Sequence, residues 1–257
     1  MKKVLLEAHQ GVASEYPGNT LAAFRAAVEQ GYGMIELDTK FTADGRCVIL
    51  HDPTVNRTAR LPDGAPLPEE TPIASLTLEE AKRLDFGLAF DERFRGERIP
   101  TLEETLRFAL DNGIPLKFDN VMQRHTPEQL GSMLDTIERM QALPLVGFTS
   151  NDPAFIRRIL ARFPSAQIHY DGPVSEDTLA ALGKFVPAAQ LTVWLRFDNE
   201  RTHWNTTPPV DARLSALARR YGRLGVWLLT EPEELEDAVG RYHAAVVETD
   251  GTLKPVK

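Results

Sequence analysis

The sequence predicts an α/β fold, a (β/α)8 TIM-type barrel, and two observations lead to this prediction. Short apolar stretches typical of strands alternate along the chain with amphipathic stretches typical of helices. This alternation is the pattern of parallel strands joined by helices. The chain has 257 residues, which is a usual length for such a barrel. A doubly wound open sheet would show the same alternation and is the alternative.

Several stretches have the length and composition of buried strands. They are VLLEAH (4–9), MIELD (34–38), CVILH (47–51), IPLKFD (114–119), LVGFTS (145–150), AQIHY (166–170), LTVWLRF (191–197), GVWLLT (225–230) and AAVVET (244–249). A (β/α)8 barrel has places for eight strands. One of these nine candidates must therefore be peripheral or wrong.

The helices between the strands have recognisable first residues. Asn19 or Thr20 precedes LAAFRAAVEQ. Thr101 precedes LEETLRFALDNG, and Thr126 precedes PEQLGSMLDTIERM. Threonine and asparagine are favoured at the N-cap, and proline fits the first helical turn. A glycine follows two of these helical stretches, which favours the end of a helix there.

Residues 52–100 differ from the rest of the chain. They are rich in proline, glycine and charge, as in DPTVNRTARLPDGAPLPEETP, and they contain no strand pattern. We expect a long insertion after the third strand that lies over the mouth of the barrel. The sequence has no internal repeat and no other break in composition, so residues 1–257 are predicted to form a single barrel domain.

Composition excludes several classes of protein. The formal net charge is −8 and the basic residues are not clustered, which argues against nucleic-acid binding. No apolar run approaches the roughly 20 residues that span a bilayer, and the N-terminus lacks a secretory signal. The one cysteine, Cys47, has no internal partner for a disulfide and lies in an apolar run. We therefore expect a soluble cytoplasmic protein with Cys47 in its core.

Polar residues stand at the ends of four predicted strands. His9 ends the first, Glu36 and Asp38 the second, His51 the third and Asp119 the fourth. Glu36 and Asp38 are two residues apart, so their side chains share one side of the strand, about 6.6 Å apart. The carboxyl ends of barrel strands converge on the face where the chemistry of such proteins is found. A lone histidine at a strand end is usually an ordinary polar residue, but five such residues at one mouth indicate a site.

The acidic residues of this group indicate a metal. Two carboxylates in an apolar strand would repel each other by roughly 4 kcal/mol at 4 Å and an effective dielectric constant near 20. A cation between them would reverse this repulsion. Since the candidate ligands are carboxylate oxygens, Mg²⁺ or Ca²⁺ is the expected ion, and it would also attract an anionic substrate.

The motifs AHQG, NTLAAFRAAVEQG, IELDTKFTADGRCVILHDPTVNRTA and IPTLEETL, within residues 5–106, resemble the glycerophosphodiester phosphodiesterase family. Looser matches follow in PLKFDN, VGFTSNDPAFIRRIL and GVWLLTEPEEL. The resemblance implies a TIM-type barrel that hydrolyses glycerophosphodiesters with a divalent metal, and hence a role in lipid metabolism. The expected partner is a small-molecule phosphodiester.

The resemblance also implies roles for individual residues. His9 and His51 correspond to the general base and general acid, and Glu36, Asp38 and Asp119 to the metal ligands. In this family the base activates the substrate's own vicinal hydroxyl, which gives a cyclic phosphate that water then opens. Family members usually have glutamate where Asp119 stands.

Some positions depart from the family pattern. Gln10 stands where an arginine is typical, which removes a charge-assisted hydrogen bond worth roughly 1.5–3 kcal/mol. Gly18 and Val121 replace a glutamate and a lysine. Lys117 or Arg196 could supply the missing cation at the substrate. The plainer interpretation is that Lys117 forms a salt bridge and that Arg196 is a rim residue.

Trp227 matches a family tryptophan that lines the substrate pocket, although a tryptophan in a strand is ordinarily a core residue. His169 and Trp194 could shape the alcohol site, with core packing as the simpler interpretation. Two other functions stay open beside the metal-dependent hydrolase. One is a cyclising lyase or sugar-phosphate diesterase on the same fold. The other is a phosphoester-binding protein without turnover.

Overall fold

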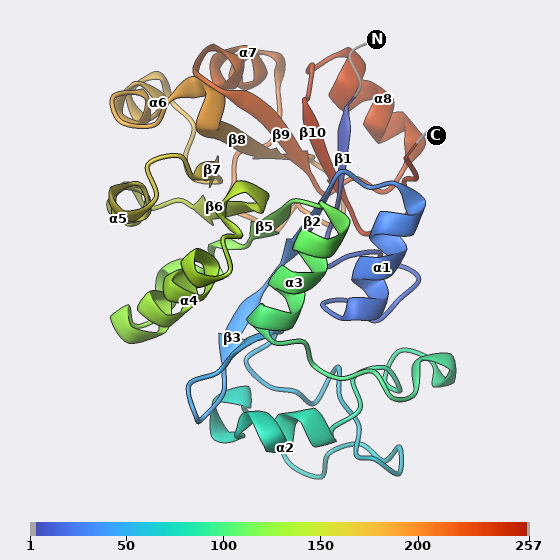
Figure 1. Cartoon of the computed structure of the whole chain (residues 1–257). Helices are drawn as coiled ribbons and strands as arrows, with labels where there is room; N and C mark the ends of the chain where they lie inside the picture. The colour runs from blue at the N-terminus through green and yellow to red at the C-terminus, as the bar shows by residue number, and fades with distance from the viewer. Residues whose placement is uncertain (1–3, 256–257) are drawn as a thin grey trace.

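The chain folds into a closed barrel of parallel strands, which confirms the predicted fold class (Figure 1). The computed structural model describes residues 4–255. Around the barrel the strands follow the order β1-β10-β9-β8-β7-β6-β5-β2. Their bounds are β1 (Leu5–Ala8), β2 (Met34–Leu37), β5 (Leu116–Phe118), β6 (Val146–Ser150), β7 (Gln167–Tyr170), β8 (Leu191–Arg196), β9 (Arg223–Trp227) and β10 (Val246–Thr249).

One of the nine predicted strands, CVILH, lies outside the barrel. It forms β4 (Cys47–Ile49), which pairs antiparallel with β3 (Thr39–Phe41), a strand that the sequence analysis missed. The connection is a tight turn in which Gly45 has a φ of +71°, a conformation that glycine adopts readily. An Asp-Gly pair between two apolar runs is a hairpin signal. The chain therefore leaves the barrel after β2, and not after a third barrel strand. Cys47, which was expected in the core, is only partly buried.

The segment of residues 39–101 packs mainly on itself. In Figure 1 it extends below α3, away from the ring of helices around the barrel. It contains η1 (Ile73–Ser75), α2 (Leu78–Arg83) and η2 (Glu92–Phe94). Its own hydrophobic cluster consists of Val48, Leu50, Val55, Ala59, Ile73, Ala81, Leu84, Phe86 and Ile99. The expectation that residues 52–100 cover the barrel mouth was wrong, because they build this separate cluster beside the barrel instead.

The helices begin where the sequence predicted. Thr20, Thr101 and Thr126 are the N-cap residues of α1, α3 and α4, and each side chain accepts a hydrogen bond from the first helical turn. Gly31 and Gly113 end α1 and α3 in the left-handed conformation. The bounds are α1 (Leu21–Gln30), α3 (Leu102–Asn112), η3 (Asn120–Arg124), α4 (Pro127–Arg139), η4 (Leu143–Leu145), α5 (Pro153–Arg162), α6 (Glu176–Gly183), η5 (Ala188–Gln190), α7 (Ala212–Tyr221) and α8 (Pro232–Gly240). In residues 4–255 no helix combines the length and apolar character needed to cross a membrane.

A buried histidine lies in the wall of the barrel. His169 on β7 is 2% exposed, and its Nδ1 accepts a hydrogen bond from Trp194 Nε1 at 3.0 Å. Burial, together with the positive charges of Lys117 and Arg223, holds the pKa of His169 well below its usual value. The ring is therefore neutral in the folded protein.

We expect this histidine to make stability fall in mild acid. Unfolded histidine takes up a proton near pH 6.5, whereas folded His169 stays neutral, so the unfolded state binds more protons as the pH falls. This contribution is present at neutral pH and is progressively lost as the pH falls through about 6.5 toward 5. Urea unfolding at neutral pH and at pH 5 should show a smaller loss of unfolding free energy for His169→Gln than for the wild-type protein. The amide oxygen of the glutamine can still accept a hydrogen bond from Trp194. An equal loss in both proteins would contradict the prediction.

Candidate active site

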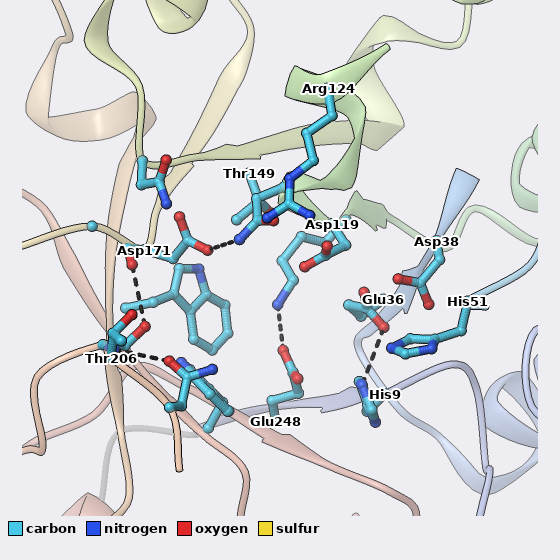
Figure 2. Close-up of a pocket in the computed structure, with 18 of the residues that line it drawn as sticks. His9, Glu36, Asp38, His51, Asp119, Arg124, Thr149, Asp171, Thr206 and Glu248 are labelled. Atoms are coloured by element: carbon cyan, nitrogen blue, oxygen red, sulfur yellow. Dashed lines mark hydrogen bonds and ion pairs between the residues drawn. The ribbon is translucent and has the colours of Figure 1, made fainter. Parts of the chain in front are cut away.

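A cavity of about 620 Å³ opens at the carboxyl ends of the barrel strands. It brings together all five residues of the predicted cluster. Figure 2 shows them on one side of the cavity, and Asp171 and Thr206 on the other. The five residues are His9, Glu36, Asp38, His51 and Asp119.

His9 is held in place from both of its neighbouring strands. Its backbone amide donates to Thr249 at 2.9 Å, which ties the end of β1 to β10. Its ring Nδ1 lies 2.7 Å from Asp250 Oδ1, and the second oxygen of Asp250 pairs with Arg201. An arginine and an aspartate therefore support His9, and its Nε2, 3.8 Å from Glu36, faces the cluster.

His51 reaches the same cavity from outside the barrel. Leu50 donates its amide to the carbonyl of Asp38 at 3.0 Å, which joins the end of the β3–β4 hairpin to the residue after β2. The ring Nδ1 of His51 lies 2.7 Å from Asp52, and Asp52 accepts from Arg57 at 2.5 Å. The arrangement thus repeats the one around His9. Within residues 39–101, His51 alone lines the cavity.

The negative charges near His9 favour its protonated form. Burial lowers the pKa of His9, but the hydrogen bond that His9 donates to Asp250 and the charges of Glu36 and Glu248 outweigh it and raise the pKa to about 10. In this arrangement of carboxylates the ring is an imidazolium at neutral pH. A change in the charge of the carboxylate cluster would therefore change the protonation of His9.

The three carboxylates are oriented by hydrogen bonds. Glu36 accepts from the backbone of Gln10 at 3.2 Å, and Asp38 accepts from the Asn19 amide at 2.9 Å. Asp119 caps η3 by accepting from Val121 at 3.0 Å. Glu36 and Asp38 are 3% and 5% exposed, so neither is solvated freely.

The chemistry of these carboxylates suits a hard dication. Burial and then the charge of Asp38 raise the pKa of Glu36 well above its usual value, and they also raise the pKa of Asp119. Carboxylates that are buried and repel one another are a site where Mg²⁺ or Ca²⁺ would offset the negative charge. No three His, Cys, Asp or Glu side chains in residues 4–255 form a ready ligand set. The residue types fit a cation, and binding one would require the carboxylates to move closer together.

Lys117 lines the cavity, but its charge is balanced by neighbours. Its Nζ lies 2.6 Å from Glu7 and also contacts Glu248, and it stands 3.9 Å from the centre of the Trp194 ring. Burial, moderated by Lys117, raises the pKa of Glu7 to about 8. Burial raises the pKa of Glu248, but the charges of Lys117 and His9 together outweigh it and lower the pKa. Lys117 therefore pairs with one ionised carboxylate, which agrees with the plainer interpretation of this lysine as a salt-bridge partner.

Two other predicted substrate residues do not line the cavity. Gln10 takes part only through its backbone amide, which donates to Glu36. Its side chain packs beside Gly18, so a larger residue at position 18 would collide with it. Arg196 donates through Nε to the carbonyl of Thr207 at 2.8 Å and pairs with Asp198. Arg196 thus holds the loop after β8. Trp227 does line the cavity.

Several residues that line the cavity or support His9 were missed by the sequence analysis. Asp171 directly follows β7, Thr149 lies near the end of β6, and Asp250 directly follows β10, so the rule used for His9 and Asp119 would have found them. Arg124 and Trp204 lie in connections after β5 and β8, where no local pattern marks them.

A model of the Glycerophosphoryl diester phosphodiesterase family matches residues 9–197. A glycerophosphodiester phosphodiesterase of Caldanaerobacter subterraneus subsp. tengcongensis is 45% identical over 109 residues, which are 42% of this chain and 42% of that protein. Glycerophosphodiester phosphodiesterase 1 of Homo sapiens is 38% identical over 114 residues, 44% of this chain and 32% of that protein. The chain thus spans less than half the length of these curated relatives.

Two solved structures show the same fold over most of the chain. A putative glycerophosphoryl diester phosphodiesterase from Silicibacter pomeroyi superposes with a TM-score of 0.77 at 22% identity, covering 96% of this chain and 90% of that one. A phosphodiesterase from Oleispira antarctica, in complex with the product sn-glycerol-3-phosphate, superposes with a TM-score of 0.74 at 20% identity. The superposition covers 96% of this chain and 93% of that one. At such identities the likeness concerns the fold alone.

Proposed function

Because the chain belongs to the glycerophosphoryl diester phosphodiesterase family, we propose that it is a metal-dependent hydrolase of glycerophosphodiesters. One observation carries this proposal beyond family membership. Two histidines, each oriented by an aspartate and an arginine, face three carboxylates in one cavity at the barrel mouth. A phosphodiester between the histidines could lose a proton on one side and gain one on the other.

The histidines carry the proton transfers of the proposed reaction. His9 in its neutral form accepts the proton of the substrate's vicinal hydroxyl, whose oxygen then bonds to phosphorus. The bond from phosphorus to the other alcohol breaks, and His51 gives that alcohol its proton. Water then opens the cyclic phosphate with the roles of the two histidines reversed, which yields a glycerol phosphate and restores both protonation states.

Other residues orient these groups. Asp250 and Asp52 hold the Nδ1 side of each ring, so each Nε2 is left for the substrate. Arg124 lines the cavity (Figure 2), and we assign it to the phosphate in place of the cations missing at positions 10 and 121. Glu36, Asp38 and Asp119 would hold Mg²⁺ or Ca²⁺. A bound dication would polarise a phosphate oxygen and offset the negative charge that keeps His9 protonated.

A panel of glycerophosphodiesters tests this function. After treatment with EDTA the protein should release no alcohol from any of them, and added Mg²⁺ or Ca²⁺ should restore the release. A cyclic phosphate as the final product would identify the cyclising lyase instead. Binding without metal-dependent release would indicate the phosphoester-binding protein. The cytoplasmic location and the role in lipid metabolism stay predictions of the sequence.

A further inference from the structure

The wall of the cavity opposite the carboxylate cluster is also polar. Figure 2 shows Asp171 and Thr149 on this far wall, across Glu248 from His9 and His51. Asn120 also lines the cavity and donates a hydrogen bond to Asp171. The proposed reaction uses none of them. Trp204, in the connection after β8, also lines the cavity and is 71% exposed.

Two buried oxygen atoms on the far wall lack partners. Within the described part of the chain, neither Asp171 Oδ1 nor Thr149 Oγ1 makes a hydrogen bond, although both atoms are shielded from solvent. Thr149 as a whole is only 3% exposed. Buried polar atoms are nearly always paired, since leaving them unpaired is unfavourable. Both residues line the cavity, so a molecule inside it could supply the missing hydrogen bonds.

The far wall is fixed in position by its own contacts. Asn120 donates its amide to the second oxygen of Asp171, which orients the carboxylate. Thr207 donates to the backbone carbonyl of Asp171 at 3.3 Å, and Arg196 donates to the carbonyl of Thr207 at 2.8 Å. The free Oδ1 of Asp171 is thus held in one place, as a recognition group requires.

The position of the histidines decides which half of a substrate can reach this wall. Both lie at the carboxylate end of the cavity (Figure 2), and the vicinal hydroxyl of the glycerol half must be within reach of one of them. Glycerol has only three carbons, so it stays near that end. The alcohol on the other side of the phosphate is left to occupy the rest of the 620 Å³ cavity.

We propose that the far wall binds the hydroxyl groups of the leaving alcohol, which is therefore a polyol such as glycerol, inositol or a sugar. This inference rests on the proposed function. A hydroxyl both donates and accepts hydrogen bonds, so it can donate to Asp171 Oδ1 and pair with Thr149 in either direction. The exposed indole of Trp204 offers a flat apolar surface for the carbon face of such an alcohol.

A quaternary ammonium alcohol fits this wall less well. A quaternary ammonium has no N–H, so it cannot donate a hydrogen bond to Asp171 Oδ1. Its recognition relies on several open aromatic faces, of which Trp204 offers one. The ring of Trp194 is already contacted by Lys117, at 3.9 Å from its centre, and stacks with His169. Arg124 adds a positive charge to the same cavity. The far wall therefore favours a neutral, hydroxyl-rich head group over choline.

Steady-state kinetics on four diesters test the inference. Glycerophosphoglycerol and glycerophosphoinositol carry hydroxyl-rich head groups, whereas glycerophosphocholine and the ethyl ester of glycerophosphate carry head groups with neither a hydroxyl nor an N–H. We expect the first pair to have the higher kcat/KM. Asp171→Asn should lower kcat/KM for the first pair by about 10- to 100-fold and leave the second pair unchanged, because it replaces the charged acceptor of the hydroxyl's hydrogen bond with a neutral amide.

A second variant and a control variant complete the test. Thr149→Val removes only an unpaired hydroxyl, so it should fold normally and lower the same kcat/KM values by a smaller factor. Asp177→Asn makes the same chemical change on α6 outside the cavity and should alter none of them. An equal loss on all four diesters for Asp171→Asn, or no loss on any, would overturn the inference alone. Failure of the wild-type protein to hydrolyse any of them with metal would instead overturn the proposed function.

Discussion

His51→Ala is expected to lower kcat on natural glycerophosphodiesters by about 10²- to 10⁴-fold, the usual contribution of a general acid. In the proposed reaction His51 protonates the departing alcohol, whose oxygen would otherwise leave as a high-energy alkoxide. The His51 side chain is 54% exposed and contacts Asp52, so its removal leaves no buried cavity and the fold should persist. Activity assays together with circular dichroism check both statements.

The choice of leaving group separates the acid role from a general loss of activity. A glycerophosphodiester of p-nitrophenol needs little protonation of its leaving oxygen. His51→Ala should therefore lose much less activity on this ester than on glycerophosphoglycerol. His243→Asn serves as the matched control, because His243 is exposed, lies before β10 at the opposite end of the barrel, and has a left-handed backbone that asparagine tolerates. Near-full activity of His51→Ala on natural diesters would contradict the acid role.

The parts of the site that the sequence predicted follow from one property of the fold. His9, Asp38 and Asp119 each stand directly after a barrel strand. Parallel barrel strands point the same way, so residues after their ends meet at one mouth whatever their separation in the chain. The strand pattern and the alternation with helices are local, and they were enough to place these side chains together.

His51 reached the right cavity for a different reason than the one predicted. The sequence analysis placed it at the end of a third barrel strand, but its strand belongs to the β3–β4 hairpin. A short apolar run looks the same in a barrel and in a hairpin, because only its hydrogen-bonded partner differs. The hairpin extends from the end of β2, and the bond from Leu50 to Asp38 brings His51 back to the mouth.

The charge states could not be predicted because they depend on distant residues. Lys117 was a candidate for the phosphate until its neighbours were known. Glu7 comes from β1 and Glu248 from β10, far from β5 in the chain, and the closed barrel brings both to the same ammonium group. Arg196 is similar, since its partner Thr207 lies in a connection without regular structure. In both cases the pairing partner decides whether a cation is available to a substrate.

Asp38→Asn is expected to weaken binding of Mg²⁺ or Ca²⁺ by about 10²-fold or more, because even the loss of a residue that only supports a ligand costs 10- to 100-fold. The same change should stabilise the metal-free protein. Asp38 raises the pKa of both Glu36 and Asp119, so removing its charge relieves repulsion among three buried or half-buried carboxylates. The bond from Asn19 can be kept, since asparagine also presents an acceptor oxygen.

Thermal unfolding measures both effects without any assay of turnover. A ligand that binds only the folded state stabilises it by about 2.7 kcal/mol at a concentration of 100 times its Kd. The wild-type protein and Asp177→Asn should therefore gain a metal-dependent rise in Tm, whereas Asp38→Asn should start from a higher Tm in EDTA and show almost no rise. An unchanged titration with both ions in Asp38→Asn would exclude this aspartate as a ligand. A lower Tm in EDTA would show that Asp38 supports the fold through Asn19 more than it repels its acidic neighbours.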